Sequence, residues 1–282
     1  MSWKPELDEI AKRRLRAQEM GGEERVARHV AAGRLPVRER VAQLLDEGSF
    51  REVGTLAGKV EYDDAGQIER YTPSNFVTGH GTLDGRRVVI GCDDFTVRGG
   101  AQDGAVGNKM GWSEKAAREL RVPIVRLVDP TSGGGSVKTN AEIKRSYVPA
   151  NPDWDIAVAV LSEIPVVAAA LGPVAGLGAA RVAASHFSVM VKEKSQLFVA
   201  GPPVVARAFG REVGKEELGG SHIHARGSGA VDNEVESEEA LLSIIPRDRR
   251  KVYDVRGHRR EQLRFRHVRS VPVQSTIHVA PR

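Results

Sequence analysis

Cysteine, aromatic residues and long apolar runs are scarce in this chain of 282 residues, of which only 5% are aromatic. The single cysteine, Cys92, excludes an internal disulfide and a zinc site built from cysteines. The longest uncharged stretch, residues 164–180, contains two prolines and three glycines and is shorter than the roughly 20 apolar residues of a membrane span. Residues 1–6 contain no apolar core, so we expect no secretory signal. These absences favour a cytoplasmic protein with no membrane partner.

The positive charge of the chain is concentrated at its C-terminal end. The net charge is +5, but residues 247–282 contain ten Arg and one Lys against three acids, a net of +8. Residues 1–246 therefore carry −3, and we expect no nucleic-acid partner for the body of the protein. Residues 247–282 form a basic tail without clear periodicity, which we expect to be poorly ordered; a basic docking arm is the alternative.

Residues 1–49 show helical periodicity and are predicted to form an N-terminal helical arm packed on a core. Leu7, Ile10 and Leu15 recur at helical spacing in a charged background. A second helix is expected at 23–32, and a third after Pro36.

Residues 50–246 alternate between strand and helix patterns and are predicted to form one α/β domain with a layered sheet. Asp84 and Gly85 separate two strand-like runs and predict a hairpin turn. Strands are expected at 77–83, 87–92, 123–129, 165–171, 187–191 and 196–199, and helices at 108–120, 153–161 and 176–184.

Three glycine-rich turns follow apolar strands, at residues 95–100, 131–136 and 172–179. Glycine lets the backbone approach a ligand closely, and a helix that begins at such a turn directs free N–H groups at an anion. Two such turns can form an oxyanion hole, which stabilises the negative oxygen of an enolate. Turns between strands and helices also contain glycine for geometric reasons alone, and for a single turn this is the commoner explanation.

Other chemical motifs are weak in this sequence. The pattern of a dinucleotide-binding fold is incomplete at 176–181, and neither a Walker A motif nor Gly-x-Ser-x-Gly occurs. His222 and His224 suit a surface loop better than a metal site, and we predict no metal. Cys92 suits a core position better than a nucleophile. Asp93 and Asp94 suit turn acceptors, and no acid–base pair stands out.

Five short motifs occur in order over about 200 residues of the chain. They are Gly-Arg-Leu-Pro-Val-Arg-Glu-Arg-Val at 33–41 with residues 44–50, Asp-Phe-Thr-Val at 94–97 with Gly99 and Gly100, Gly-Pro-Val-Ala-Gly at 172–176, residues 191–202, and Glu-Glu-Leu-Gly-Gly at 216–220 with His224. In this order they resemble the carboxyltransferase β subunits of biotin-dependent acyl-CoA carboxylases, such as propionyl-CoA carboxylase. The resemblance covers roughly residues 5–250.

The resemblance implies a crotonase-like fold of stacked β-β-α units that binds an acyl-CoA. It implies that a carboxyl group moves from carboxybiotin to the α-carbon of the acyl-CoA. The implied partners are a biotin carboxyl carrier or biotin carboxylase subunit and further copies or paralogues in a homo- or hetero-oligomer. Biotin is carried by the partner, and the resemblance implies no metal in this chain.

The implied reaction gives roles to the glycine turns and, by location alone, to nearby cations. The enolate oxygen would be held by backbone N–H groups of the two later turns, through Gly133, Gly134, Gly135, Gly176 and Gly178. The CoA phosphates would be held near the first turn and beyond it by Arg98, Gly99, Gly100, Lys138 and, by location, Lys109. Solvated surface charge is the alternative for each of these cations.

The chain departs from the family pattern in two places and in length. The segment 129–136 has two extra residues and no Arg where the family has Asp-Ser-Gly-Gly-Ala-Arg, and Leu177 replaces a usual glycine. The family normally has two crotonase-like halves, and the pattern here fades after the first, near Glu239. We therefore keep three hypotheses: the acyl-CoA half of a split carboxyltransferase, a truncated subunit that binds or assembles without catalysis, and, more weakly, an independent crotonase-type hydratase.

Overall fold

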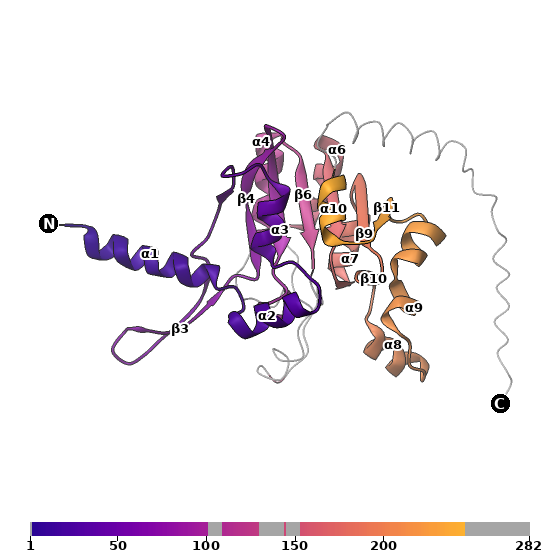
Figure 1. Ribbon diagram of the computed structural model, residues 1–282, viewed down its shortest axis with the longest axis horizontal. Helices are drawn as coiled ribbons and strands as arrows, with labels where there is room; N and C mark the ends of the chain where they lie inside the picture. Colours follow the sequence, from indigo (N-terminus) through magenta and orange to yellow (C-terminus); the bar gives the residue numbers. More distant parts are fainter. Residues whose placement is uncertain (1, 101–108, 130–143, 145–152, 246–282) are drawn as a thin grey trace.

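A seven-stranded sheet forms the centre of the protein (Figure 1). The computed structural model describes residues 2–100, 109–129, 144 and 153–245. The strand order is β1 (Arg51–Glu52), β4 (Phe76–Leu83), β5 (Arg86–Asp93), β6 (Ile124–Val128), β7 (Val166–Ala170), β9 (Phe187–Val191) and β11 (Asn233–Val235). The pairs β1–β4 and β4–β5 are antiparallel, and the pairs from β5 to β11 are parallel.

The predicted hairpin turn at Asp84 and Gly85 is confirmed. Strands β4 and β5 pair in register from Phe76 opposite Asp93 to Leu83 opposite Arg86. Asp84 and Gly85 have φ angles of 50° and 73°, which is the pair of left-handed residues that a tight two-residue hairpin requires. Asp46 fixes the turn, because its carboxylate accepts both turn amides at 2.9 and 2.8 Å.

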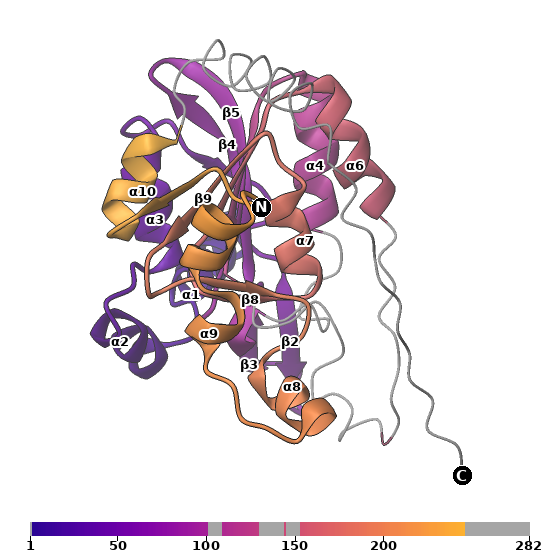
Figure 2. The same ribbon diagram turned by 90° about the vertical axis from the view of Figure 1, so that its right-hand side faces the viewer.

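Helices cover both faces of the sheet, as Figure 2 shows edge-on. Side chains alternate along each parallel strand, so Ile90, Leu127 and Val189 point to one face, and Val89, Ala168 and Met190 to the other. The first face packs under α3 (Val37–Leu44) and α10 (Glu238–Ile244). The second packs under α4 (Lys109–Leu120), α6 (Trp154–Glu163) and α7 (Leu177–Ala183). Burial on both faces explains the apolar runs that mark these strands in the sequence.

One buried cation joins the three helices of the second face. Arg126 in the middle of β6 is fully buried and makes two hydrogen bonds to the carboxylate of Glu114 in α4, at 2.8 and 2.9 Å. It also donates to the carbonyls of Ala157 and Ala184, at 3.2 and 2.7 Å. Each nitrogen of this guanidinium therefore donates a hydrogen bond. A buried charge is tolerated in a core only when it is hydrogen-bonded in this way.

The remaining elements lie around this layered body. The arm contains α1 (Lys4–Gln18) and α2 (Glu23–Ala31). A two-stranded ribbon, β2 (Gly58–Tyr62) with β3 (Ile68–Pro73), was not predicted, and β8 (Pro173–Ala175) pairs with β10 (Gln196–Phe198) as a second small sheet. A 3-10 turn (Arg98–Gly100), α8 (Pro202–Phe209), α9 (Lys215–Gly219) and a π-helix (His222–Gly227) complete the described elements.

Helix α3 lies within residues 1–49, the segment predicted as a helical arm packed on a core. Helix α3 belongs to the core of the domain, because Val37, Val41 and Leu44 are buried in the largest apolar cluster. Of the three helices of this segment, α3 has the most buried residues, whereas α1 and α2 have one each. The predicted tail, 247–282, lies outside the described residues.

Among the described helices, none combines the length and apolar character needed to cross a membrane.

Candidate functional site

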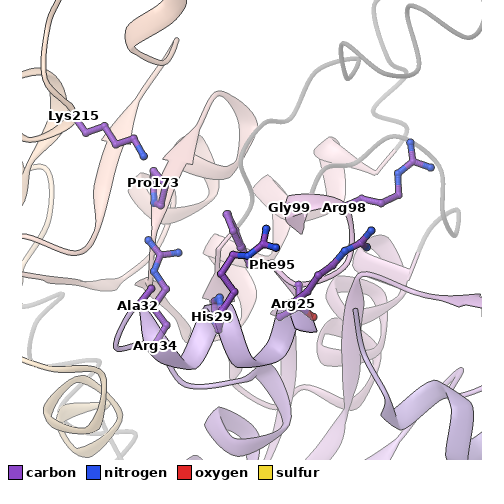
Figure 3. Close-up of a pocket in the computed structure, with 11 residues that line it drawn as sticks. Arg25, His29, Ala32, Arg34, Phe95, Arg98, Gly99, Pro173 and Lys215 are labelled. Carbon is purple, nitrogen blue, oxygen red and sulfur yellow. The ribbon is translucent and has the colours of Figure 1, made fainter. Parts of the chain in front are cut away.

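A cavity of about 580 Å³ opens between the arm and the ends of the sheet strands (Figure 3). Helix α2, the loop that follows β5, the first residue of β8 and the first residue of α9 contribute its walls. Figure 3 shows Lys215 reaching toward Pro173 from one side and Arg34 from the other. The lining residues are Arg25, Arg28, His29, Ala32, Arg34, Phe95, Thr96, Arg98, Gly99, Pro173 and Lys215.

The cavity wall is cationic. Four arginines and one lysine line it, and no carboxylate does so among the described residues. Arg25 and Lys215 form no ion pair with any residue in the part of the chain that the structure describes, whereas Arg28 pairs with Glu24 at 2.6 Å on the exposed side of α2. A volume of this size accommodates a small-molecule ligand, and the charge selects an anion. The contribution of α2 was not predicted, because its basic residues follow the pattern of a solvated helix.

Phe95 forms the apolar centre of this wall. The Arg34 guanidinium carbon lies 5.3 Å from the ring centroid, and the His29 ring stacks on Phe95 at 5.8 Å. His29 is buried, and this burial together with the nearby Arg40 lowers its pKa. Its Nε2 lies 3.2 Å from the Leu35 carbonyl, which fits a neutral ring that donates from Nε2. The cations of the wall are therefore arginine and lysine rather than histidine.

A buried ion cluster anchors this wall to the core. Arg40 in α3 donates to Asp129 at 2.8 Å and makes two bonds to Glu238 in α10, at 2.8 and 2.9 Å. All three side chains are at most 2% exposed, and the two carboxylates raise the pKa of Arg40 despite its burial. Arg34 joins the cluster, because its Nη1 lies 3.5 Å from the second Asp129 oxygen. Arg34, which lines the cavity, is thereby linked to Asp129, the residue that follows β6.

Gly172 permits this approach of Arg34 to Asp129. A Cβ atom at position 172 would lie 2.1 Å from Asp129 Oδ1 and 2.8 Å from Arg34 Nη1. Gly172 has an ordinary backbone conformation, so glycine is required here for space rather than for a positive φ. Gly172, the first glycine of the third glycine-rich turn, therefore has a packing role beside the cavity.

The predicted phosphate-binding residues are partly brought together. Arg98 and Gly99 line the cavity, and both have left-handed φ angles, 55° and 66°. Gly100 is buried, donates to the Val97 carbonyl at 3.1 Å and is not in the cavity wall. Asp94 supports the loop as a turn acceptor, as predicted, because Oδ1 accepts from the Thr96 amide and hydroxyl at 2.9 and 2.6 Å. Lys138 lies outside the described residues.

Only two of the five residues predicted as oxyanion donors, Gly176 and Gly178, lie among the described residues. Gly133, Gly134 and Gly135 lie outside the described residues. The Gly176 amide donates to the Phe198 carbonyl at 2.9 Å, so this particular amide is occupied. Helix α7 makes its first internal bond from Ala180 to the Gly176 carbonyl at 3.1 Å, and the amides of Leu177, Gly178 and Ala179 have no partner among the described residues. At this turn the free donors therefore begin one residue later than predicted.

Lys109 does not line the cavity. Its side chain is 10% exposed and lies 3.9 Å from Glu52, and both residues line a separate small pocket. Burial lowers its pKa from the usual 10.5 to about 8, and Glu52 offsets part of that shift. Burial thus destabilises the protonated form of Lys109 in the folded state, whereas in the unfolded chain this form is fully hydrated.

We expect Lys109→Met to stabilise the protein at pH 7. The unfolded chain binds the proton of Lys109 more tightly between pH 8 and 10.5, so the wild type gains stability as the pH rises through that range. The gain from the substitution is at most about 3 kcal/mol at pH 7 and shrinks toward zero near pH 10.5. Urea unfolding of both proteins at pH 7 and pH 10 measures it, and an equal difference at the two pH values would contradict the assignment.

Two other candidates have structural explanations. Nε2 of His224 lies 2.8 Å from the Leu197 carbonyl, so this histidine fastens the π-helix to β10. His222 is exposed, and among the described residues no group of three potential metal ligands occurs. Cys92 is fully buried in β5, and burial raises the pKa of its thiol, which suits the predicted core role.

Comparison with known proteins identifies this architecture. A propionyl-CoA carboxylase carboxyltransferase subunit of Haloferax mediterranei is 30% identical over 250 residues, covering 87% of this chain and 46% of that protein. The transcarboxylase 12S hexamer core, solved with methylmalonyl-coenzyme A and methylmalonic acid bound, superposes with a TM-score of 0.71 at 27% identity, over 86% of this chain and 47% of that one. The fold also matches 95% of one chain of the Pseudomonas malonate decarboxylase hetero-dimer and 81% of this chain, with a TM-score of 0.53 and 22% identity.

The sheet, its helix layers and these structural matches define a crotonase-like α/β protein of the carboxyltransferase class, which confirms the predicted fold. The carboxyl transferase domain matches residues 28–258, most of the chain. The chain belongs to the carboxyl transferase domain family. It spans about half the length of the curated relatives it matches.

Proposed function

We propose that this chain is the acyl-CoA-binding half of a biotin-dependent carboxyltransferase. The observation that carries the proposal is the cavity walled by four arginines, Lys215 and Phe95, with no carboxylate among the described lining residues. Coenzyme A offers phosphate groups and an aromatic base, which match cations and an apolar ring. The family membership of residues 28–258 and the similarity to carboxylase β subunits support the same ligand.

The residues of this chain would act by holding and orienting the thioester. Arg25, Arg34 and Lys215 bind the phosphates, and Arg34 is itself positioned by Asp129. Amides at the start of α7, from Leu177 onward, support the developing negative oxygen together with the proposed donors at Gly133, Gly134 and Gly135. Carboxybiotin carried by a partner protein supplies the carboxyl group. Within the part of the chain that the structure describes, we assign no residue to biotin, so the roles of these residues concern the thioester alone.

The proposed reaction needs two carboxyltransferase halves and a source of carboxybiotin. The curated relatives are about twice as long as the matched region, so the proposed partners are a second carboxyltransferase half and a biotin carrier or biotin carboxylase subunit. The alternative is a non-catalytic subunit that binds acyl-CoA or assembles with longer paralogues. We place either form in the cytoplasm, where proteins rarely carry disulfides, because the single cysteine of the chain, Cys92, cannot form one within it.

Calorimetric titration with coenzyme A tests the binding site, and a carboxylation assay tests catalysis. We expect binding of one CoA per chain, weakening as salt is raised, because the wall is cationic and open to solvent. If the chain alone binds CoA without turnover, and addition of the partner that supplies the second half produces turnover, the split enzyme is supported. If the chain binds CoA but no partner produces turnover, the non-catalytic subunit is supported. Absence of CoA binding at low salt would contradict both.

A further inference from the structure

The connection between α2 and α3 contains a short segment, Gly33–Leu35, which we call the Arg34 loop. Two groups from far along the chain hold its ends. The Gly33 carbonyl accepts from Lys194 Nζ at 2.9 Å, and the Leu35 amide donates to the Glu238 carboxylate at 3.3 Å. Arg34 lies between these two contacts, and its side chain lines the cavity (Figure 3). The position of this cation therefore depends on how the loop is fastened.

Glu238 is the buried residue that fastens the loop from the side of the sheet. It begins α10, which packs beside α3 on the first face (Figure 2). Its Oε2 accepts from the Leu35 amide and from Arg40 Nε, and its Oε1 accepts from Arg40 Nη2. Glu238, Leu35 and Arg40 do not line the cavity. Glu238 therefore acts on a ligand only through the residues that it holds.

The charge of Glu238 also decides how Arg40 shares Asp129 with Arg34. Two nitrogens of Arg40 bind Glu238, so only Nη1 is directed at Asp129, where it bonds Oδ2 at 2.8 Å. The other oxygen, Oδ1, lies 3.5 Å from Arg34 Nη1. An arginine whose second carboxylate is removed tends to bind the remaining one with two parallel bonds. Without the charge of Glu238, Arg40 would compete with Arg34 for Asp129 Oδ1.

We propose that Glu238 is a positioning residue for the cavity ligand, because it holds the Arg34 loop so that the Arg34 guanidinium faces the phosphates of CoA. The inference rests on the proposed function, which places a CoA phosphate against Arg34. Glu238 lies 203 residues after Leu35 in the sequence and outside the cavity. Helix α10, the last described helix, thereby sets the affinity of a site formed largely by the first hundred residues.

A double-mutant cycle measured by calorimetry with CoA tests this role. Glu238→Gln keeps the size of the side chain and removes its charge, and it should weaken CoA binding by about 3- to 30-fold. In the Arg34→Met background the same substitution should change the affinity by less than about 2-fold, because no guanidinium remains to be positioned. An equal loss of affinity in both backgrounds shows a general structural effect and overturns the proposal.

Glu114→Gln is the matched control for burial. Glu114 is as buried as Glu238 and likewise makes two hydrogen bonds to a buried arginine, Arg126, but it lies under the other face of the sheet. Both variants should lower the melting temperature to a similar degree, and only Glu238→Gln should weaken CoA binding. If Glu114→Gln weakened it as much, the loop would have no special dependence on Glu238.

Hydrogen exchange of the wild-type chain tests the same coupling without any substitution. Coupling between two sites is reciprocal, so bound CoA should slow exchange of the Leu35 amide and of the α10 amides more than that of the α6 amides. Protection of α10 no greater than that of α6 would overturn the proposal. A wild type that binds CoA and is unaffected by Glu238→Gln overturns the positioning role alone. A wild type that does not bind CoA overturns the proposed function and this inference together.

Discussion

Replacing Arg40 with Met is expected to lower the free energy of unfolding by about 3–5 kcal/mol, the largest effect of any single substitution considered for this protein. Arg40 links Asp129 to Glu238, and all three side chains are buried. Its removal leaves two carboxylates in the core without their main counterion, and each must be protonated or hydrated. Urea denaturation at pH 7 measures the loss.

Two further variants separate this effect from a general loss of charge. Arg28→Met removes an exposed ion pair with Glu24 and should change stability by no more than about 0.5 kcal/mol. Adding Glu238→Gln to Arg40→Met neutralises one stranded carboxylate and should recover part of the loss. If Arg40→Met and Arg28→Met were equally stable, the buried cluster would have no special role.

Replacing Arg34 with Met is expected to weaken CoA binding by about 10- to 100-fold. A hydrogen bond to a charged group contributes about 1.5–3 kcal/mol, and each 1.4 kcal/mol is a factor of ten. Arg34 also makes a cation–π contact with the Phe95 ring at 5.3 Å, which methionine cannot replace. Asp129 keeps Arg40 at 2.8 Å, so the fold should survive the substitution. Calorimetry with CoA measures the change.

The matched control is Arg118→Met, which removes an exposed arginine paired with Glu163 between α4 and α6, outside the cavity wall. It should bind CoA as the wild type does. Equal affinities of the Arg34 and Arg118 variants would place the phosphates elsewhere, while leaving the family membership of the chain intact. Loss of binding accompanied by a large fall in melting temperature would point instead to a structural role of Arg34.

Much of the fold was predictable because local signals agree with burial. The sheet strands β5, β6, β7 and β9 are covered on both faces, so each appears in the sequence as an apolar run, and glycine or proline stands directly before β5, β6 and β7. The β2–β3 ribbon was missed because only one of its residues is fully buried, and residues such as Lys59, Glu61 and Arg70 resemble a polar loop. Helix α3 was assigned to the arm because the sequence shows its apolar face but not the sheet that the face covers.

The candidate site was less predictable because folding, not local sequence, brings its parts together. Arg34 and Phe95 are 61 residues apart, and Arg40 and Glu238 are 198 apart. The loop with Arg98 and Gly99 was found from its motif, whereas Arg25 and Lys215 belong to no motif and were not predicted. One signal was available: Arg40 lies between Val37, Val41 and Leu44 on the apolar face of its helix, where a charge requires a buried partner.

The strand order also governs how the sheet is assembled during synthesis. Along the sheet, each strand from β4 to β11 follows its neighbour in chain order, so a nascent chain can add strands one after another as they leave the ribosome. Arg40 emerges early, with α3, and Glu238 only with the last described helix. Until α10 docks, the guanidinium has Asp129 as its sole acidic partner within the cluster. Docking of α10 is therefore the late step that locks the domain, and nascent chains stalled before residue 238 should remain open to proteolysis.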